Sequence, residues 1–327
     1  MGGNALVESH GIKSERMDKK VYTELENYIV SILTKLGVNF KTVKYYHEKD
    51  DFGDLDIVVS RENDAVAKIR NFFHEHNIKH TNEFREDQNV SIFSALFNGD
   101  RHQVDFMFVD KPELESASEY YSYNDIWNLL GKIIKTYDYK LGWNGLLYTY
   151  RNGNHYKKDI VLTYNLLTAL EILGLDWERY KQGFNNYDEM FEYVTSCKAF
   201  DKTKFALENL NHRNRVRDRK RKTYNLFLQY IEDKEYNNDV IPLPHPTKVF
   251  PLLSAKIRAL DNKFKDKNRA KEIINGNIVR NVTGLDGKDI NKILTTFRVR
   301  YDVDAILKMK PEFVESQIKE IVKELGL

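Results

Sequence analysis

The dipeptide Asn98-Gly99 lies between two apolar segments and restricts how this chain folds more than any other feature of its sequence. Asn-Gly readily adopts the left-handed backbone angles of a tight hairpin turn, so residues 91–97 and 103–109 are predicted to pair as antiparallel strands. Residues 55–59 are short, apolar and rich in β-branched side chains, which is typical of an inner strand. The sequence therefore predicts a β-sheet in the first third of the chain.

Helical patterns flank these strands along the sequence. Apolar residues recur at steps of three and four over residues 21–36, where Gly37 ends the pattern, and again over residues 63–76. This spacing places the apolar side chains on one face of a helix. Residues 38–46 are predicted to be extended. The order helix, strand, strand, helix, strand, strand predicts an α+β fold built on one small mixed sheet.

The prolines divide the chain into three parts. Pro112 stands alone near one third of the length, and the prolines at 242, 244, 246 and 251 predict an extended linker. We expect a small mixed-sheet domain over 1–112, a mostly helical domain over 113–240, and a proline-rich linker with a C-terminal helical domain over 241–327. Helices of the middle part are predicted at 124–136, 159–174, 186–197, 203–211 and 216–233.

Composition excludes several classes of protein. The single cysteine, Cys197, rules out an intramolecular disulfide and a cysteine-based zinc site. No apolar run approaches the ~18–20 residues that a membrane helix needs, so we expect no membrane partner and a cytoplasmic location. The 51 basic and 49 acidic residues nearly cancel, so only local clusters of charge can point to partners.

Three aspartates stand at strand positions where charge is unexpected. Because side chains alternate along a strand, Asp54 and Asp56 point to one side while Leu55 points to the other. Asp105 is the one charged residue in the apolar segment 104–109, and such a buried acid is costly unless it is paired or bound to a metal. If the two strands are neighbours, the three carboxylates form a site for hard cations such as Mg²⁺. An Asp-x-Asp pair alone also occurs in ordinary turns.

These residues resemble the signature of the nucleotidyltransferase superfamily, which includes DNA polymerase beta, poly(A) polymerases and CCA-adding enzymes. The resemblance rests on residues 53–58, Gly-Asp-Leu-Asp-Ile-Val, and on 104–106, Val-Asp-Phe, and it covers about residues 20–110. It makes 1–112 the catalytic domain. It also implies that Asp54 and Asp56 bind two Mg²⁺ or Mn²⁺ ions, while Asp105 binds the catalytic ion and helps to activate the attacking hydroxyl.

A weaker similarity points to a viral source. The opening residues 1–5, Met-Gly-Gly-Asn-Ala, and the basic residues 209–224 are similar to those of nucleotidyltransferases of large bacterial viruses. The location would then be the cytoplasm of the host cell.

The triphosphate-binding element of that family is missing. The family carries Gly-Ser about a dozen residues before the first acid, whereas this chain reads Thr-Val-Lys-Tyr-Tyr-His-Glu-Lys over residues 42–49. Lys44, His47 and Lys49 supply positive charge there, and Gly2-Gly3 offers bare amides of the kind that bind anions. An ordinary solvated loop explains the same residues equally well.

Further nucleotide contacts are expected at three positions. Gly53 allows a phosphate to approach the backbone beside the first acid. Lys132 and Lys135 lie on a predicted helix where similar enzymes place lysines against the triphosphate. Surface charge is an equal explanation for both lysines.

Residues 211–222 contain seven basic side chains and one acid. Such a density beside a metal-binding domain favours contact with polyphosphate or nucleic acid, although basic runs also form solvated faces. The predicted contacts are Arg213, Arg215, Arg217, Arg219, Lys220, Arg221 and Lys222.

A second candidate for nucleic-acid contact is the segment 282–290, Val-Thr-Gly-Leu-Asp-Gly-Lys-Asp-Ile. It resembles the turn of helix-hairpin-helix elements, with Gly284, Gly287 and Lys288 as the contact residues, and this resemblance makes the C-terminal helical part of 241–327 the expected nucleic-acid-binding domain. Asn291 replaces the usual last glycine, and a glycine-rich turn that caps a helix explains the same residues.

Together these features predict a template-independent nucleotidyltransferase. We expect it to add nucleoside monophosphates from NTPs, with ATP as the expected substrate, to the 3′ end of RNA, as poly(A) polymerases and CCA-adding enzymes do. Two alternatives stay open. One is nucleotidylation of a protein or small molecule, and the other is a non-catalytic nucleic-acid-binding protein on the same fold, because the Gly-Ser element is missing.

Overall fold

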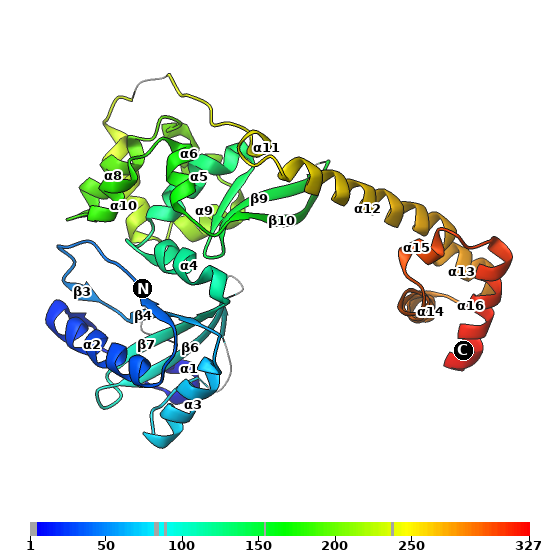
Figure 1. Cartoon of the computed structure of the whole chain (residues 1–327), viewed down its shortest axis with the longest axis horizontal. Helices are drawn as coiled ribbons and strands as arrows, with labels where there is room; N and C mark the ends of the chain where they lie inside the picture. The colour runs from blue at the N-terminus through cyan, green and yellow to red at the C-terminus, as the bar shows by residue number, and fades with distance from the viewer. Residues whose placement is uncertain (1–4, 82–84, 88–89, 154, 237–238) are drawn as a thin grey trace. The chain divides into compact units, whose positions relative to one another are not determined.

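The computed structural model describes the whole chain except residues 1–4, 82–84, 88–89, 154 and 237–238 (Figure 1). Gly2 and Gly3, proposed as an anion site, lie outside the described residues. The chain forms two compact units, Met1–Val249 and Phe250–Leu327. The expected boundary at 112 falls inside the first unit, and the second unit begins within the predicted third segment.

The predicted α+β fold is confirmed. A five-stranded mixed sheet has the order β2-β4-β7-β6-β5, in which β4 and β7 are parallel and the other pairs antiparallel. The hairpin around Asn98-Gly99 forms as predicted, with φ of 53° and 67° at these two residues. The strands are β2 (Phe40–Thr42), β4 (Leu55–Ser60), β5 (Arg85–Asp87), β6 (Val90–Phe97) and β7 (His102–Val109).

One face of this sheet is apolar and is covered by α2 (Lys19–Lys35) and α3 (Ala65–Glu75). Alternate residues of β4 and β7, such as Leu55 and Phe106, are buried against these helices. The side chain of Asp18 accepts a hydrogen bond from the Val21 amide and so fixes the start of α2.

The opposite face is covered only in part by α4 (Leu114–Tyr121). Val58, Met107 and Val109, near the carboxyl ends of β4 and β7, are buried in the cluster that includes Ala117 of this helix. The amino-terminal half of the same face carries the aspartates. The apolar half and the acidic half of one sheet face are therefore adjacent.

The middle of the chain is less helical than predicted. Strands β8 (Tyr139–Gly142), β9 (Gly145–Asn152) and β10 (His155–Thr163) form an antiparallel sheet of order β10-β9-β8. The helix predicted over 159–174 is therefore wrong at its start, and α6 begins only at Leu167. Asn144-Gly145 joins β8 to β9, and Gly153, with φ of 58°, follows Asn152 in the β9–β10 turn, so two further Asn-Gly signals were present in the sequence.

Two other predicted helices also differ in detail. The helix predicted over 203–211 is wrong: two 3₁₀ turns, Lys202–Phe205 and Leu207–Asn209, are separated by Ala206, whose ψ of 130° is not helical. The helix predicted over 216–233 is interrupted by Arg219–Arg221 and forms two helices. The helices of this region are α5 (Ile126–Ile134), α6 (Leu167–Leu173), α7 (Trp177–Gln182), α8 (Tyr187–Thr195), α9 (His212–Asp218) and α10 (Lys222–Glu232).

Short elements complete the first unit. Strands β1 (Met17–Asp18) and β3 (Asp51–Phe52) pair with each other, and α1 (Val7–His10) and α11 (Pro246–Val249) lie near the two ends of the unit's sequence.

The second unit is helical and has its own apolar core. Buried residues of this core include Ile293, Phe297, Ile318 and Ile321. Its helices are α12 (Leu253–Ile273), α13 (Gly276–Thr283), α14 (Gly287–Arg300), α15 (Val303–Ile306) and α16 (Pro311–Leu325).

Candidate active site

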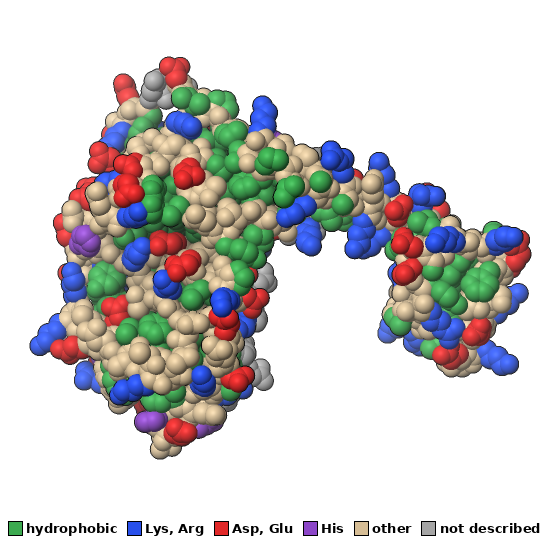
Figure 2. Space-filling model, in the orientation of Figure 1, with side chains coloured by type: hydrophobic (Ala, Val, Ile, Leu, Met, Phe, Trp, Pro, Cys, Tyr) green, Lys and Arg blue, Asp and Glu red, His purple; other side chains and the backbone are tan. Residues whose placement is uncertain are grey.

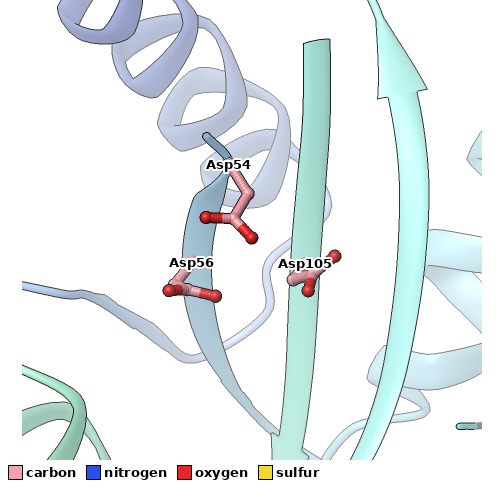
Figure 3. A group of neighbouring side chains, drawn as sticks. All are labelled: Asp54, Asp56 and Asp105. Atoms are coloured by element: carbon pink, nitrogen blue, oxygen red, sulfur yellow. The ribbon is translucent and has the colours of Figure 1, made fainter. Parts of the chain in front are cut away.

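The three predicted aspartates meet on the sheet. Asp56 of β4 and Asp105 of β7 are register partners in the parallel pair. Asp54 lies two residues before Asp56 and so on the same side of the chain. One carboxylate oxygen of each residue lies within 4.8 Å of the others, and Figure 3 shows Asp56 and Asp105 on neighbouring strands with Asp54 directly before β4.

This carboxylate cluster can hold a divalent metal ion. Asp105 is buried and the other two aspartates are half-buried, so water screens their mutual repulsion only in part. A bound cation relieves that repulsion, and carboxylate oxygens are the ligands that Mg²⁺ and Mn²⁺ prefer. Gly53 lies half-buried between β3 and β4, directly before the cluster.

A hydrogen-bond chain fixes the third carboxylate. Gln103 is buried, and its side-chain nitrogen donates to one oxygen of Asp105 at 2.8 Å. The side-chain oxygen of Gln103 accepts a bond from the backbone amide of Ala5 at 3.0 Å. The amide of Gln103 is thus held at both ends, which restricts the rotation of the Asp105 carboxylate.

A buried hydroxyl next to the cluster lacks a partner. Ser94 of β6 is the antiparallel register partner of Asp105, so both side chains project from the same face. Ser94 is fully buried, and its Oγ makes no hydrogen bond within the described part of the chain. Buried polar atoms normally have a partner, so a ligand or ordered water beside Asp105 fits this position. The residues present therefore fit a hydrated metal ion.

Cations from separate segments surround the cluster. The Nζ of Lys49 lies 4.4 Å from the centre of the Phe52 ring, and Asp56 and Asp54 both act on its charge. Burial lowers the pKa of Lys49, and these two carboxylates oppose that shift. Arg16 pairs with Asp51 at 2.5 Å and also interacts electrostatically with Asp54. Lys49 and Arg16 therefore bring positive charge within electrostatic reach of the aspartates.

Asp51 also connects this region with the basic stretch of the sequence. Its pKa is lowered, first by the hydrogen bond from Arg16 and further by the charges of Lys222 and Lys49. Lys222 begins α10, so the end of the predicted basic stretch lies within electrostatic reach of the segment that leads into β4.

The segment that replaces the Gly-Ser element is a loop bound to the helical part of the unit. The backbone amides of His47 and Glu48 donate to the carbonyl oxygens of Phe184 and Asn185, each at 2.8 Å. Lys44 forms an ion pair of 2.7 Å with Glu119 of α4. Lys49 is therefore the lysine of this loop that the structure brings beside the aspartates, and Lys44 is engaged elsewhere.

Lys132 is part of a buried ion pair. Its Nζ lies 2.6 Å from Asp218, and the two side chains are 8% and 0% exposed. Burial would raise the pKa of Asp218, but hydrogen bonds from Arg217 and Lys132 outweigh it, and the net shift is downward. Lys135, by contrast, is exposed at the end of α5. The expected triphosphate contacts of both lysines stay predictions.

The basic stretch divides into engaged and exposed side chains. Arg217 donates to Asn128 and pairs with Asp218, Arg221 pairs with Asp125, and Arg215 donates to the Leu210 carbonyl. The contacts to Asn128 and Asp125 connect α9 and the residue before α10 with α5 and its N-cap residue. The remaining predicted contacts are exposed to solvent: Arg213, Arg219, Lys220 and Lys222.

The predicted helix-hairpin-helix turn connects α13 and α14. Gly284 ends α13 with φ of 71°, Gly287 begins α14 with φ of 58°, and Lys288 is exposed. Left-handed angles at both glycines explain the residue choice by turn geometry alone. A role of these residues in nucleic-acid contact stays a prediction.

Sequence reasoning missed Gln103, Ser94 and Asp218. Asp218 carried a signal, since it is the one acid within the basic stretch.

Comparison of the sequence with models of known protein families and with characterised proteins gives no match. No helix in the described part of the chain has the length and apolar character needed to cross a membrane.

Proposed function

We propose that this protein is a metal-dependent nucleotidyltransferase that transfers nucleoside monophosphates from NTPs to a 3′ hydroxyl of RNA. The observation that carries this proposal is the cluster of Asp56 and Asp105 on adjacent strands with Asp54 directly before β4, and with the unpartnered hydroxyl of Ser94 beside it. The partly covered sheet face and the nearby cations are secondary support.

In the proposed reaction the 3′ oxygen forms a bond to the α-phosphorus, pyrophosphate leaves, and the hydroxyl proton passes to solvent. Asp54 and Asp56 would hold two Mg²⁺ ions, and Asp105 would hold the one next to the acceptor. When bound, such ions lower the pKa of the attacking hydroxyl and neutralise the triphosphate. Gln103 donates a hydrogen bond to one oxygen of Asp105 and would so orient this carboxylate for the metal.

Lys49 is the residue best placed to compensate for the missing Gly-Ser element. It is partly desolvated beside the acid pair, so its charge acts more strongly on a phosphate than it would in bulk water. Arg16 and Lys222 both act electrostatically on Asp51 and add positive charge to this region. We assign the triphosphate to this group of cations and the RNA backbone to the exposed residues Arg213, Arg219 and Lys220.

The decisive experiment incubates the purified chain with a labelled RNA primer, Mg²⁺ and each of the four NTPs in turn. Extended primer supports the proposal, and an Asp56→Asn variant, which keeps nearly the same shape, should abolish the extension. Label on the protein or on a small molecule would point to a different acceptor. If no product forms although Mn²⁺ binds to the wild type and not to Asp56→Asn, the chain is a metal-binding protein without this activity.

A further inference from the structure

The second unit differs from the first in charge. Residues 250–327 contain 16 lysines and arginines and 11 acids, whereas the first unit contains 35 and 38. Most of this excess lies in α12, whose 21 residues include seven basic and three acidic ones. The near-neutral total of the chain thus conceals a basic helix.

The basic side chains of α12 are in contact with solvent. All seven basic side chains are exposed, and Leu253 and Ala270 are the buried residues of this helix. Figure 2, in the orientation of Figure 1, shows Lys and Arg side chains along α12. Within the described residues, Arg269 forms an ion pair with Asp266, and Lys256, Lys263 and Lys267 form none.

Helical spacing sorts these residues into two rows. Lys256, Lys263 and Lys267 are separated by seven and four positions and so lie on one side of the helix. Arg258, Lys265 and Arg269 have the same spacing and lie roughly opposite. We call the first set the lysine row and the second set the arginine row.

The two rows differ in their acidic neighbours. Asp261 and Glu272 lie on the side of the arginine row, and Asp266 pairs with Arg269. The lysine row has no acid on its own side of α12 except Asp266, which lies between the two rows, three positions after Lys263. It extends about 16 Å along the axis, which corresponds to about five phosphates of one duplex strand.

We propose that the lysine row of α12 is a binding surface for the sugar–phosphate backbone of a nucleic acid. Nucleic acid is the occupant that a line of exposed lysine charges on one side of a helix fits, because its phosphates also repeat along a line. A single free phosphate would need converging groups, which a straight helix does not provide. Release of condensed counterions from several phosphates supplies the binding free energy.

This surface extends the proposed function, since it would hold the RNA on a unit separate from the carboxylate cluster. It rests on the proposed function only in the choice of RNA as the probe. Its test uses equilibrium binding without NTP or added Mg²⁺, so a failure of catalysis would leave its outcome readable.

The experiment measures the affinity of the full chain for a fluorescein-labelled single-stranded RNA at several salt concentrations. The variant is Lys263→Gln/Lys267→Gln, and the matched control is Arg258→Gln/Lys265→Gln, which removes the same charge from the opposite side. Glutamine keeps the helix propensity of both positions. We expect the log–log slope to fall by roughly 1.4 in the lysine-row variant, as two lost contacts to a single strand predict, and to change much less in the control.

Three results would overturn the inference. The first is a lysine-row variant whose slope and affinity stay at the wild-type values. The second is an equal decrease of the slope in both double variants, which would show only a general effect of net positive charge. The third is a lysine-row variant that loses binding to phosphatidylserine vesicles while its RNA binding is unchanged. A wild-type circular dichroism spectrum is expected for both variants, because neither change removes an ion pair of the second unit.

Discussion

Lys132 should act as a structural residue, and Lys132→Met is the change that tests this. In the wild type, Lys132 holds one oxygen of the fully buried Asp218 at 2.6 Å, and Arg217 holds the other at 2.8 Å. Methionine keeps the length and apolar contacts of the lysine side chain without its charge. The substitution would therefore leave half of a buried carboxylate without a partner.

The magnitude follows from these contacts. Removing one partner of a buried ion pair lowers the free energy of unfolding by ~3–5 kcal/mol when the remaining charge has no other contact. Here Arg217 still binds Asp218, so the loss should approach that of one charged hydrogen bond, about 1.5–3 kcal/mol. We expect a loss of about 3 kcal/mol, at the upper end, because the Asp218 side chain has no access to solvent.

Urea unfolding followed by tryptophan fluorescence measures this loss. The signal reports on the first structural unit, which contains Lys132, because Trp127, Trp143 and Trp177 all belong to that unit. The exposed Lys135→Met is the matched control and should change stability by less than about 0.5 kcal/mol. A second variant, Lys132→Met/Asp218→Leu, should recover much of the stability, because it removes the buried charge as well as its partner.

Either of two results would refute this reasoning. One is wild-type stability of Lys132→Met, and the other is a double variant less stable than the single one. If Lys132→Met instead keeps its stability and raises the KM for NTP, the lysine contacts the triphosphate, as the sequence alone suggested.

Further predictions concern the candidate active site. Asp56→Asn and Asp105→Asn should each lower Mn²⁺ affinity by more than roughly 100-fold, because losing a direct ligand exceeds the ~10–100-fold effect of losing a residue that orients one. Calorimetry measures this affinity, and a near-normal value in either variant would contradict the ligand assignment. Gln103→Leu should weaken Mn²⁺ binding about 10–100-fold, and unchanged binding would mean that Gln103 has only a packing role. Lys49→Gln should raise the KM for NTP and leave RNA affinity unchanged, whereas the reverse result would place Lys49 at the acceptor.

The sequence was sufficient for four of the five strands of the first sheet and for the three acids, but β5 was not predicted. Strand alternation placed Asp54 and Asp56 on one side, and an acid inside an apolar strand singled out Asp105. These are local signals, and the structure needed only to bring β4 and β7 together. The register Asp56–Asp105 itself depends on the parallel pairing of strands separated by a helix and a hairpin, which no local pattern specifies.

The parts that sequence reasoning missed depend on distant partners. Lys132 has the same local pattern whether it meets a triphosphate or Asp218, and only the fold of α9 onto α5 decides between them. Gln103 reads as an ordinary polar strand residue until Ala5 is placed beside it. The second sheet was missed because the apolar residues of β10 also fit a helical period, and a short run of this kind is ambiguous.

The pairing of β4 with β7 also determines which inactive variants are informative. A slip of one residue would turn Asp105 toward α2 and α3, into a cluster that contains Phe93 and Phe108. The free energy needed to bury an unpaired carboxylate there disfavours the slipped sheet by several kcal/mol. The acid therefore protects the alignment of the strands in addition to any role in binding. An apolar replacement such as Asp105→Leu would remove this protection and would confuse loss of the metal with misalignment, whereas Asp105→Asn keeps a polar group that still resists the apolar face.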